Sequence, residues 1–104
     1  MATKYRFVWD PRKADANERK HGISFEHARR VFFDPLVKND MEGYNHGEIR
    51  WTAIGEIDGR GVAIVIHTSR EESEDGTEEI VEIIRIISAR RASPRERALY
   101  SETS

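Results

Sequence analysis

The N-terminal third of the chain changes from an alternating to a helical pattern of apolar residues. Aromatic side chains occupy every second position of Tyr5–Trp9, which predicts a strand with one apolar face. An Asp-Pro pair is a typical helix start and glycine a typical helix stop, so a polar helix is predicted over Pro11–Lys20, ending at Gly22. A second, amphipathic helix is predicted from Ser24 to Asp34.

The rest of the chain is dominated by strand patterns. Apolar runs predict strands over residues 36–41, 49–57, 62–68 and 80–88. Asp58–Gly61 is typical of a hairpin turn, whereas residues 42–47 and the acidic stretch Glu71–Glu79 are predicted to be loops. A capping box at Ser93–Glu96 predicts a short C-terminal helix reaching about Tyr100. The order predicts one α+β sandwich domain over residues 1–104, with the helices on one face of a mostly antiparallel sheet.

The last predicted strand carries arginine among isoleucines. Strict alternation places Arg85 on the face of Ile83 and Ile87, and places Ser88 and Arg90 on the opposite face, with the other isoleucines. An arginine in so apolar a strand loses hydration, so it must meet a carboxylate or bind an incoming anion. The sequence offers three candidate carboxylates for such an ion pair: Glu18, Glu26 and Glu48.

Charge is segregated along the chain. Residues 1–30 carry a net charge of +4, residues 31–84 carry −9 and residues 85–104 carry +3, although the whole chain is at −2. If the two basic ends lie together they form a surface suited to phosphate; otherwise the charges are simply a solvated surface. Arg90 and Arg91 precede the capped helix, whose N-terminus is itself favourable for anions.

Four other side chains have both a structural and a functional interpretation. Asn17 is expected to form a structural hydrogen-bond network near Gly22, whereas Lys20 and His21 suit phosphate binding and proton transfer as well as they suit a structural role. Tyr100 can stack on a nucleobase or anchor the last helix.

Composition excludes several classes of function. The chain has no cysteine, so disulfides, thiol nucleophiles and thiolate metal sites are absent. No apolar run is long enough to span a bilayer and no signal peptide is recognisable, so a soluble, cytoplasmic protein is expected. The four histidines lack metal-ligand spacing, and phosphate-binding loops and hydrolase elbows are missing, so neither a metal nor a cofactor is expected.

The chain resembles the BrnT-type toxins of bacterial type II toxin–antitoxin systems. The resemblance runs from about residue 5 to residue 100, and its most specific blocks are Lys20-His21-Gly22 and Arg85-Ile86-Ile87-Ser88-Ala89-Arg90. Further matching stretches are Trp9-Asp10-Pro11, Ile23-Ser24-Phe25-Glu26, Val31-Phe32 with Asp34-Pro35, Arg50 to Gly55, and Thr68 with Arg70. Two segments depart from the family pattern: the acidic stretch Glu71–Glu79 is longer, and Glu42–Gly47 has no clear counterpart.

The resemblance implies a RelE-like fold and an endoribonuclease that inhibits translation without a metal. It also implies a BrnA-like antitoxin as partner, in a hetero-oligomer expected to hold two toxins and two antitoxins, with operator DNA bound only through the antitoxin and no membrane contact. An alternative is a non-catalytic module that binds an acidic partner and acts only in operon autoregulation; a metal-dependent nuclease is a third interpretation.

The mechanism expected from these residues is attack of the ribose 2′-hydroxyl on the adjacent phosphorus, which gives a 2′,3′-cyclic phosphate. Arg85 and Arg90 are expected to stabilise the phosphorane, and His21 or His67 to carry protons, with Lys20 near the RNA backbone. The other candidate substrate-binding residues are Arg70, Arg91, Tyr100, Glu26 and Ser88.

Overall fold

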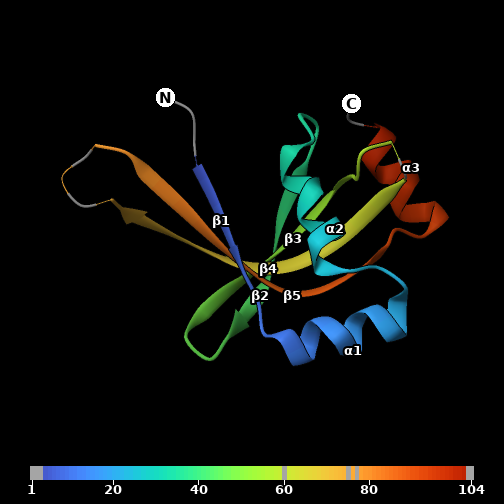
Figure 1. Cartoon of the computed structure of the whole chain (residues 1–104). Helices are drawn as coiled ribbons and strands as arrows, with labels where there is room; N and C mark the ends of the chain where they lie inside the picture. Colours follow the sequence, from blue (N-terminus) through green and yellow to red (C-terminus); the bar gives the residue numbers. More distant parts are fainter. Residues whose placement is uncertain (1–3, 60, 75, 77, 103–104) are drawn as a thin grey trace.

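The computed structural model describes residues 4–59, 61–74, 76 and 78–102. Its elements, shown in Figure 1, are β1 (Lys4–Val8), α1 (Pro11–His21), α2 (Phe25–Ala28), the 3-10 helix η1 (Arg29–Phe33), β2 (Lys38–Asn45), β3 (Glu48–Glu56), β4 (Val62–Ser73), β5 (Ile80–Arg91) and α3 (Pro94–Glu102). Within these described ranges no helix combines the length and apolar character needed to cross a membrane.

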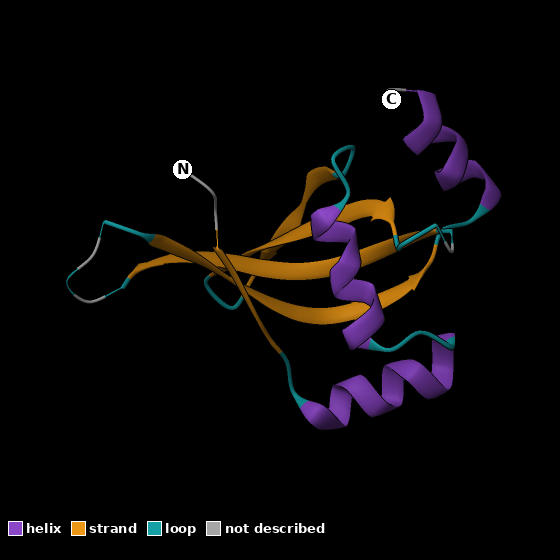
Figure 2. Ribbon diagram, turned by 45° about the horizontal axis from the view of Figure 1, so that its top comes forward, coloured by secondary structure: helices purple, strands orange, loops and turns teal. Residues whose placement is uncertain are grey.

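The strands form one sheet in the order β1-β5-β4-β3-β2, in which β1 runs parallel to β5 and every other pair is antiparallel. Figure 2 shows α1 and the α2–η1 segment beside the sheet, and α3 at one end of it. The core joins apolar residues of α2 and η1 to one face of the central strands: Phe25, Ala28, Val31 and Phe32 against Ala53, Val65, Ile84 and Ile86. The predicted α+β architecture is confirmed.

A buried amide of helix α1 forms hydrogen bonds to β5. Asp10 caps its N-terminus by accepting a hydrogen bond from the Arg12 backbone, and Gly22 ends it in the left-handed conformation. Asn17, only 8% exposed, donates to the Ala89 carbonyl at 2.8 Å and accepts from the Ala89 N–H at 3.1 Å. The structural role expected for Asn17 is therefore confirmed.

The outer hairpin is longer than predicted. β2 extends to Asn45, where a loop was expected over residues 42–47, and the connection to β3 is a tight turn at His46 and Gly47. Both turn residues have positive φ, 50° and 78°, which suits the twist of a two-residue hairpin. The prediction was wrong because this edge strand is largely exposed, so its pairing with β3 leaves little trace in the hydrophobic pattern.

The acidic stretch begins as strand. β4 continues to Ser73, so that Glu71–Ser73 form part of an arm with the start of β5, whereas the described residues of the stretch beyond Ser73 lie between the two strands, where the loop was expected. Figure 1 shows this arm extending away from the body of the molecule. The second predicted helix is split, because α2 gives way to η1 at Arg29. The Asp58–Gly61 turn is confirmed by the hydrogen bond from Ile57 N–H to Gly61 O, with Arg60 outside the described residues.

A β-bulge in β5 changes which side chains share a face. Thr68 of β4 lies opposite Arg85, but Ile66 lies opposite Ser88 and Ile64 opposite Arg90, so β5 holds one extra residue, Ile87. Arg85, Ser88 and Arg90 therefore share the face turned away from the core, here called the second face. The alternation that placed Ser88 and Arg90 opposite Arg85 was wrong because a bulge shifts the period by one residue.

Helix α3 is tied to the rest of the protein at both ends. Ser93 and Glu96 form the predicted capping box, with hydrogen bonds of 2.8 and 3.2 Å between side chains and backbone N–H groups. Tyr100, 7% exposed, donates to the Asp34 carboxylate, which also accepts from the Glu56 N–H at 2.7 Å. Burial, followed by the Asp34 contact, raises the pKa of Tyr100 to about 12. Tyr100 thus anchors the helix.

Replacing Asn17 should remove the hydrogen bonds between α1 and β5 and so destabilise the protein. We expect Asn17→Ala to lower the free energy of unfolding by about 1–3 kcal/mol, because it leaves buried backbone groups at Ala89 without a partner. Urea unfolding followed by circular dichroism measures this change. Asn45→Ala, at an exposed position of β2, is the control and should shift the midpoint little. Equal midpoints for the two variants would contradict the role given to Asn17.

Candidate functional site

An ion pair on the second face links β5 to β3. The Arg85 Nη2 atom lies 2.6 Å from Glu48 Oε1, and each side chain is 47% exposed. Glu48 is thus the partner among the three carboxylates that the sequence offered. Half-exposed ion pairs contribute little to stability, so this contact leaves the guanidinium free to exchange its partner for an incoming anion.

A hollow of about 320 Å³ surrounds this ion pair on one side. Its charged or titratable lining residues include Arg85, Glu48, Arg50, Lys13 and His46. Lys13 comes from the first half of α1, His46 from the turn between β2 and β3, and Arg50 from β3. Three cations, an imidazole and two carboxylates, those of Glu48 and of Asp10 at the N-cap of α1, therefore line one opening. This is a suitable combination for holding a phosphate and transferring protons.

A smaller hollow of about 70 Å³ lies on the other side of the same ion pair. It shares Arg85 and Glu48 with the first hollow and adds Arg70 and Thr68 of β4. The Arg70 guanidinium lies 3.2 Å from the exposed Glu72 carboxylate. Arg70 therefore extends the cationic surface of the Arg85 site along the sheet.

Arg90 lies on the same face but has a different partner. Its guanidinium makes two parallel hydrogen bonds to the Glu96 carboxylate, at 2.7 and 2.8 Å. These bonds lower the pKa of Glu96 to about 2, with a smaller contribution from the Ser93 backbone, and they raise the pKa of Arg90. Because of the bulge, Arg85 and Arg90 pair with Thr68 and Ile64, which lie four residues apart on β4, roughly 13 Å. The two arginines therefore do not converge on one phosphate, contrary to the expectation from the sequence.

Lys20 and His21 occupy the last turn of α1, where Lys20 is exposed and His21 half-buried. The basic residue that α1 contributes to the Arg85 hollow is Lys13, near the opposite end of the helix. Seven residues of helix separate Lys13 from Lys20, roughly 10 Å. Lys20 and His21 therefore do not line the hollow around Arg85, contrary to the expectation from the sequence. Lys13, near the start of α1, lines it instead.

His67 lies on the core side of β4, away from Arg85. Its ring is 3% exposed, packs edge-on against Phe32 with 4.8 Å between centroids, and bonds to the Val65 carbonyl through Nδ1 at 3.3 Å. Burial lowers the pKa of His67, although the Val65 carbonyl opposes the shift. A neutral, buried imidazole on the opposite face is poorly placed to exchange protons with a substrate at Arg85, so the structure does not favour this role.

The remaining candidates are distributed over the molecule. Glu26 is exposed and pairs with Arg29 at 3.0 Å, one turn along the chain. Ser88 lies on the second face between the two arginines, and Arg91 ends β5. Because the Tyr100 ring is buried beside Asp34, it is not available to stack on a base; its alternative role as an anchor is the one observed.

Three residues of the hollow were not predicted from the sequence, and two others, Glu48 and Asp10, were expected to have only structural roles. Lys13, His46 and Arg50 stand in segments whose charged residues look like ordinary surface positions, and Glu48 was considered only as an ion-pair partner. They come together only because β2 pairs with β3 and α1 packs against β5. Among the described residues, no group of three or more histidine, aspartate or glutamate side chains is arranged to hold a metal ion.

Comparisons with known proteins agree with this architecture. Residues 9–96 match the family model of the ribonuclease toxin BrnT of type II toxin–antitoxin systems. The fold is similar to the 1.1 Å crystal structure of the Brucella abortus ribonuclease toxin BrnT, with a TM-score of 0.58 and 26% sequence identity over 86% of this chain and 97% of that one. Comparison with curated protein sequences gave no match.

The family match and the fold place the chain in a class of small toxins, the ribonuclease toxins of type II toxin–antitoxin systems. Because the family model covers most of the sequence, the chain belongs to the BrnT family. The resemblance inferred from the sequence motifs is thereby confirmed.

The Arg90–Glu96 pair should make folding sensitive to acid. The depressed pKa of Glu96 means that its contribution to stability is complete above the ordinary value of 4.5 and is lost as the pH falls towards 2. We therefore expect wild-type protein to lose more stability than Glu96→Gln between pH 4.5 and pH 2. Thermal unfolding across this range measures the difference. Glu102→Gln, at the exposed end of α3, should behave as wild type; parallel pH curves for all three proteins would contradict this assignment.

Proposed function

We propose that this protein is a metal-independent endoribonuclease whose reaction centre is the hollow around Arg85 and Glu48. The observation that carries the proposal is the 2.6 Å contact between the guanidinium and the carboxylate, flanked by Lys13, Arg50 and His46. Within the BrnT family the substrate is RNA, and RNA supplies its own nucleophile in the ribose 2′-hydroxyl. The protein then has to hold a phosphate, stabilise developing negative charge and move two protons.

In the proposed reaction, Glu48 accepts the proton of the 2′-hydroxyl. The 2′-oxygen forms a bond to the adjacent phosphorus, and the phosphorus–O5′ bond breaks. A substrate phosphate takes the place of Glu48 on part of the Arg85 guanidinium, which has five N–H donors and can contact both groups. Arg85 thereby holds the carboxylate beside the nucleophile and stabilises the non-bridging oxygens of the phosphorane.

His46 is the candidate acid for the leaving O5′ oxygen. Histidine is the side chain most often used for proton transfer, and His46 lines the same hollow as Arg85 and Glu48. For this reason we prefer His46 to His21 or His67, which the sequence suggested. Lys13 and Arg50 add positive charge of the kind that a metal ion supplies in other nucleases. The products are a 2′,3′-cyclic phosphate and a 5′-hydroxyl end.

The RNA strand follows the second face on either side of this centre. Arg70 contacts the backbone at the smaller hollow, and Ser88 lies in the direction of Arg90. At roughly 13 Å from Arg85, Arg90 reaches a phosphate a few nucleotides away and exchanges Glu96 for it. Arg90 is therefore assigned to binding rather than to the chemical step, and Arg91 at the end of β5 extends the same path.

The proposal extends to the biological setting, which membership of the family supports. The protein acts in the cytoplasm, cuts transcripts and so inhibits translation. A BrnA-like antitoxin neutralises it in a complex of two toxins and two antitoxins, and this complex reaches operator DNA only through the antitoxin. The grouping with RelE-like folds belongs to the same proposal.

Removing either member of the central ion pair should slow cleavage strongly without unfolding the protein. We expect Arg85→Ala to reduce the cleavage rate about 10²–10³-fold, which corresponds to about 2.7–4 kcal/mol of lost transition-state stabilisation. Glu48→Gln should reduce it similarly, because an amide cannot accept the proton. The measurement is cleavage of a 5′-labelled RNA by purified, antitoxin-free protein in EDTA.

Arg95→Ala is the matched control, because Arg95 is an exposed arginine in the first turn of α3. It should cleave as wild type. Wild-type rates for both Arg85→Ala and Glu48→Gln would overturn the assignment of the site. Activity lost in EDTA and restored by a divalent cation would favour a metal-dependent nuclease. Intact RNA and normal bacterial growth on induction of the toxin alone would favour a module that only binds its partner.

A further inference from the structure

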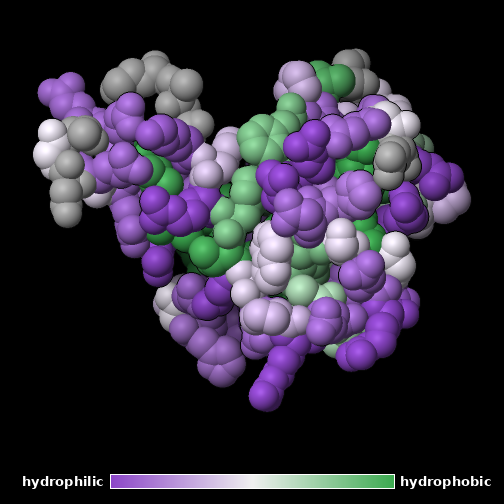
Figure 3. Space-filling model, in the orientation of Figure 1, coloured by the Kyte–Doolittle hydropathy of each residue, from purple (hydrophilic) through white to green (hydrophobic). Residues whose placement is uncertain are grey.

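A second cavity lies on the opposite side of the sheet from the Arg85 site. It has a volume of about 550 Å³ and opens between the β4–β5 arm and the body of the molecule, where Figure 3 shows a notch in the surface. Tyr5, Phe32 and Trp51 provide aromatic walls, and His67, Glu71 and Glu82 provide polar groups. None of these side chains belongs to the proposed reaction centre.

One margin of this cavity is an unpaired strand edge. β4 pairs with β3 only as far as the contact between His67 and Trp51, whereas it remains paired with β5 as far as Ser73. Thr68–Ser73 therefore present one row of backbone N–H and C=O groups with no neighbouring strand in the described sheet. Six residues of strand span roughly 20 Å, enough to pair with a short extended peptide.

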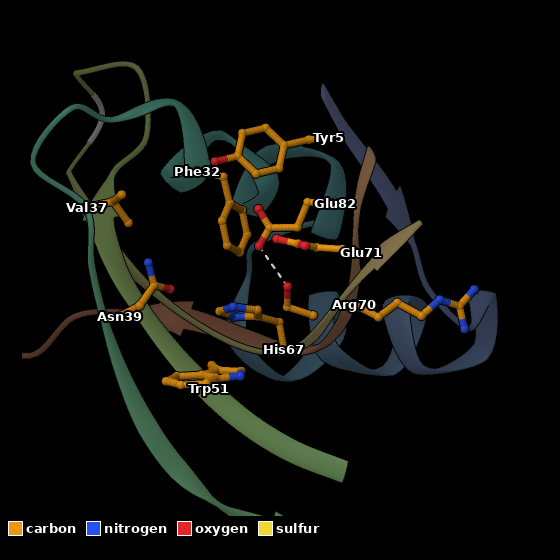
Figure 4. Close-up of a pocket in the computed structure, with 10 residues that line it drawn as sticks. Tyr5, Phe32, Val37, Asn39, Trp51, His67, Arg70, Glu71 and Glu82 are labelled. Carbon is orange, nitrogen blue, oxygen red and sulfur yellow. Dashed lines mark hydrogen bonds between the residues drawn. The ribbon is translucent and has the colours of Figure 1, made fainter. Parts of the chain in front are cut away.

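Two carboxylates meet in the cavity beside this edge. Glu71 and Glu82 are directly opposite one another in the β4–β5 register, and Figure 4 shows both carboxylates pointing into the same space. Glu82 accepts a hydrogen bond from Ser69 Oγ at 2.7 Å, but no cation among the described residues lies within salt-bridge distance of either carboxylate. Like charges facing each other across strands are destabilising, so a positive group from outside would relieve the repulsion.

His67 adds a third acceptor to the same cavity. Its Nδ1 atom faces the Val65 carbonyl and must donate to it, so in the neutral ring Nε2 carries no proton and can only accept. The ring is 97% buried and lines the cavity below Phe32. The cavity therefore offers acceptors and aromatic faces to a ligand, while Arg70 at its rim points away (Figure 4).

Carboxylates beside aromatic rings favour a guanidinium or ammonium group. Such a cation makes charge-assisted hydrogen bonds to the carboxylates and can lie against the face of Trp51 or Tyr5. RNA is a poor occupant, because its phosphates would approach Glu71 and Glu82 and the acidic arm that continues through Glu72 and Glu74. A basic protein segment can form backbone hydrogen bonds to the strand edge and place a positive side chain beside the two carboxylates.

We propose that an extended, basic segment of the antitoxin adds to the free edge of β4 at Thr68–Ser73 and inserts an arginine or lysine side chain between Glu71 and Glu82. This inference rests on the proposed function only in taking the partner to be an antitoxin. The added strand would lie next to Arg70, which lines both this cavity and the smaller hollow beside Arg85. Occupation of the cavity would thus obstruct RNA at the neighbouring site.

The proposal is tested by binding of the BrnA-like antitoxin to the full-length toxin. We expect the double variant Glu71→Gln with Glu82→Gln to bind the antitoxin at least tenfold more weakly in isothermal titration calorimetry, and to need correspondingly more antitoxin for inhibition of RNA cleavage. Loss of a like-charge pair does not endanger folding. Glu72→Gln is the matched control, because Glu72 belongs to the same strand, is 49% exposed and faces Arg70 instead of the cavity.

Hydrogen exchange provides an independent measurement on the same proteins. The antitoxin should protect backbone amides within Thr68–Ser73, whereas a 2′-O-methyl RNA that cannot be cleaved should leave them unchanged. Equal antitoxin affinity for the double variant and for Glu72→Gln would overturn the proposal, as would protection of this segment by the RNA and not by the antitoxin. A wild-type protein that does not cut RNA, yet shows the expected antitoxin binding, would refute the nuclease function and support the docking site.

Discussion

Strand β5 contains one residue more than the stretch of β4 with which it pairs, and the resulting bulge at Ile87 decides the direction of its functional side chains. On the near side of the bulge, Ile84 and Ile86 enter the core and Arg85 faces outwards. Beyond it, Ala89 returns to the core and Arg90 faces outwards. Without the extra residue, one of the two arginines would be directed into the apolar interior, at a cost that no available partner there could offset.

The same strand is fixed from both sides, so the positions of its arginines are well determined. β1 and β4 pair with its first half, and Asn17 of α1 binds both backbone groups of Ala89 in its second half. Arg85 therefore stands opposite Glu48 on a rigid base, while the side chains themselves are half exposed and able to change partners. Such a site suits anion binding: the Glu48 carboxylate neutralises Arg85 in the free protein, and an incoming phosphate can take over part of the contact while the backbone stays in place.

The sheet separates two surfaces of opposite character. The second face carries the arginines proposed to contact RNA, and the cavity on the core side carries the carboxylates of Glu71 and Glu82 beside aromatic rings. They meet where β4 loses its neighbour β3, at Ser69 and Arg70, which line both the cavity and the smaller hollow. In the proposed scheme an antitoxin does not need to imitate RNA to inhibit the toxin, since a strand bound at this edge lies beside the RNA path.

Local chemistry in the sequence predicted the elements that form by local rules. The caps of α1 and α3, the stop at Gly22, the role of Asn17 and the α+β order all follow from residue type and spacing. Features that depend on pairing over long distances escaped prediction: the bulge, the polar edge strand β2 and the length of the arm. The site was predicted only in part for the same reason. Arg85 is conspicuous in an apolar strand, whereas Lys13 and His46 join the site only because their elements pack beside β5 and β3 in the folded protein.

The most direct test of the central claim is the chemistry of the products. An RNA oligonucleotide and its 2′-deoxy counterpart would be incubated with purified toxin in EDTA, and the new ends identified by mass spectrometry. We predict that the RNA is cut to 2′,3′-cyclic phosphate and 5′-hydroxyl ends and that the deoxy strand remains intact. Cleavage of the deoxy strand, or 5′-phosphate ends on the RNA products, would contradict a reaction in which the 2′-hydroxyl is the nucleophile.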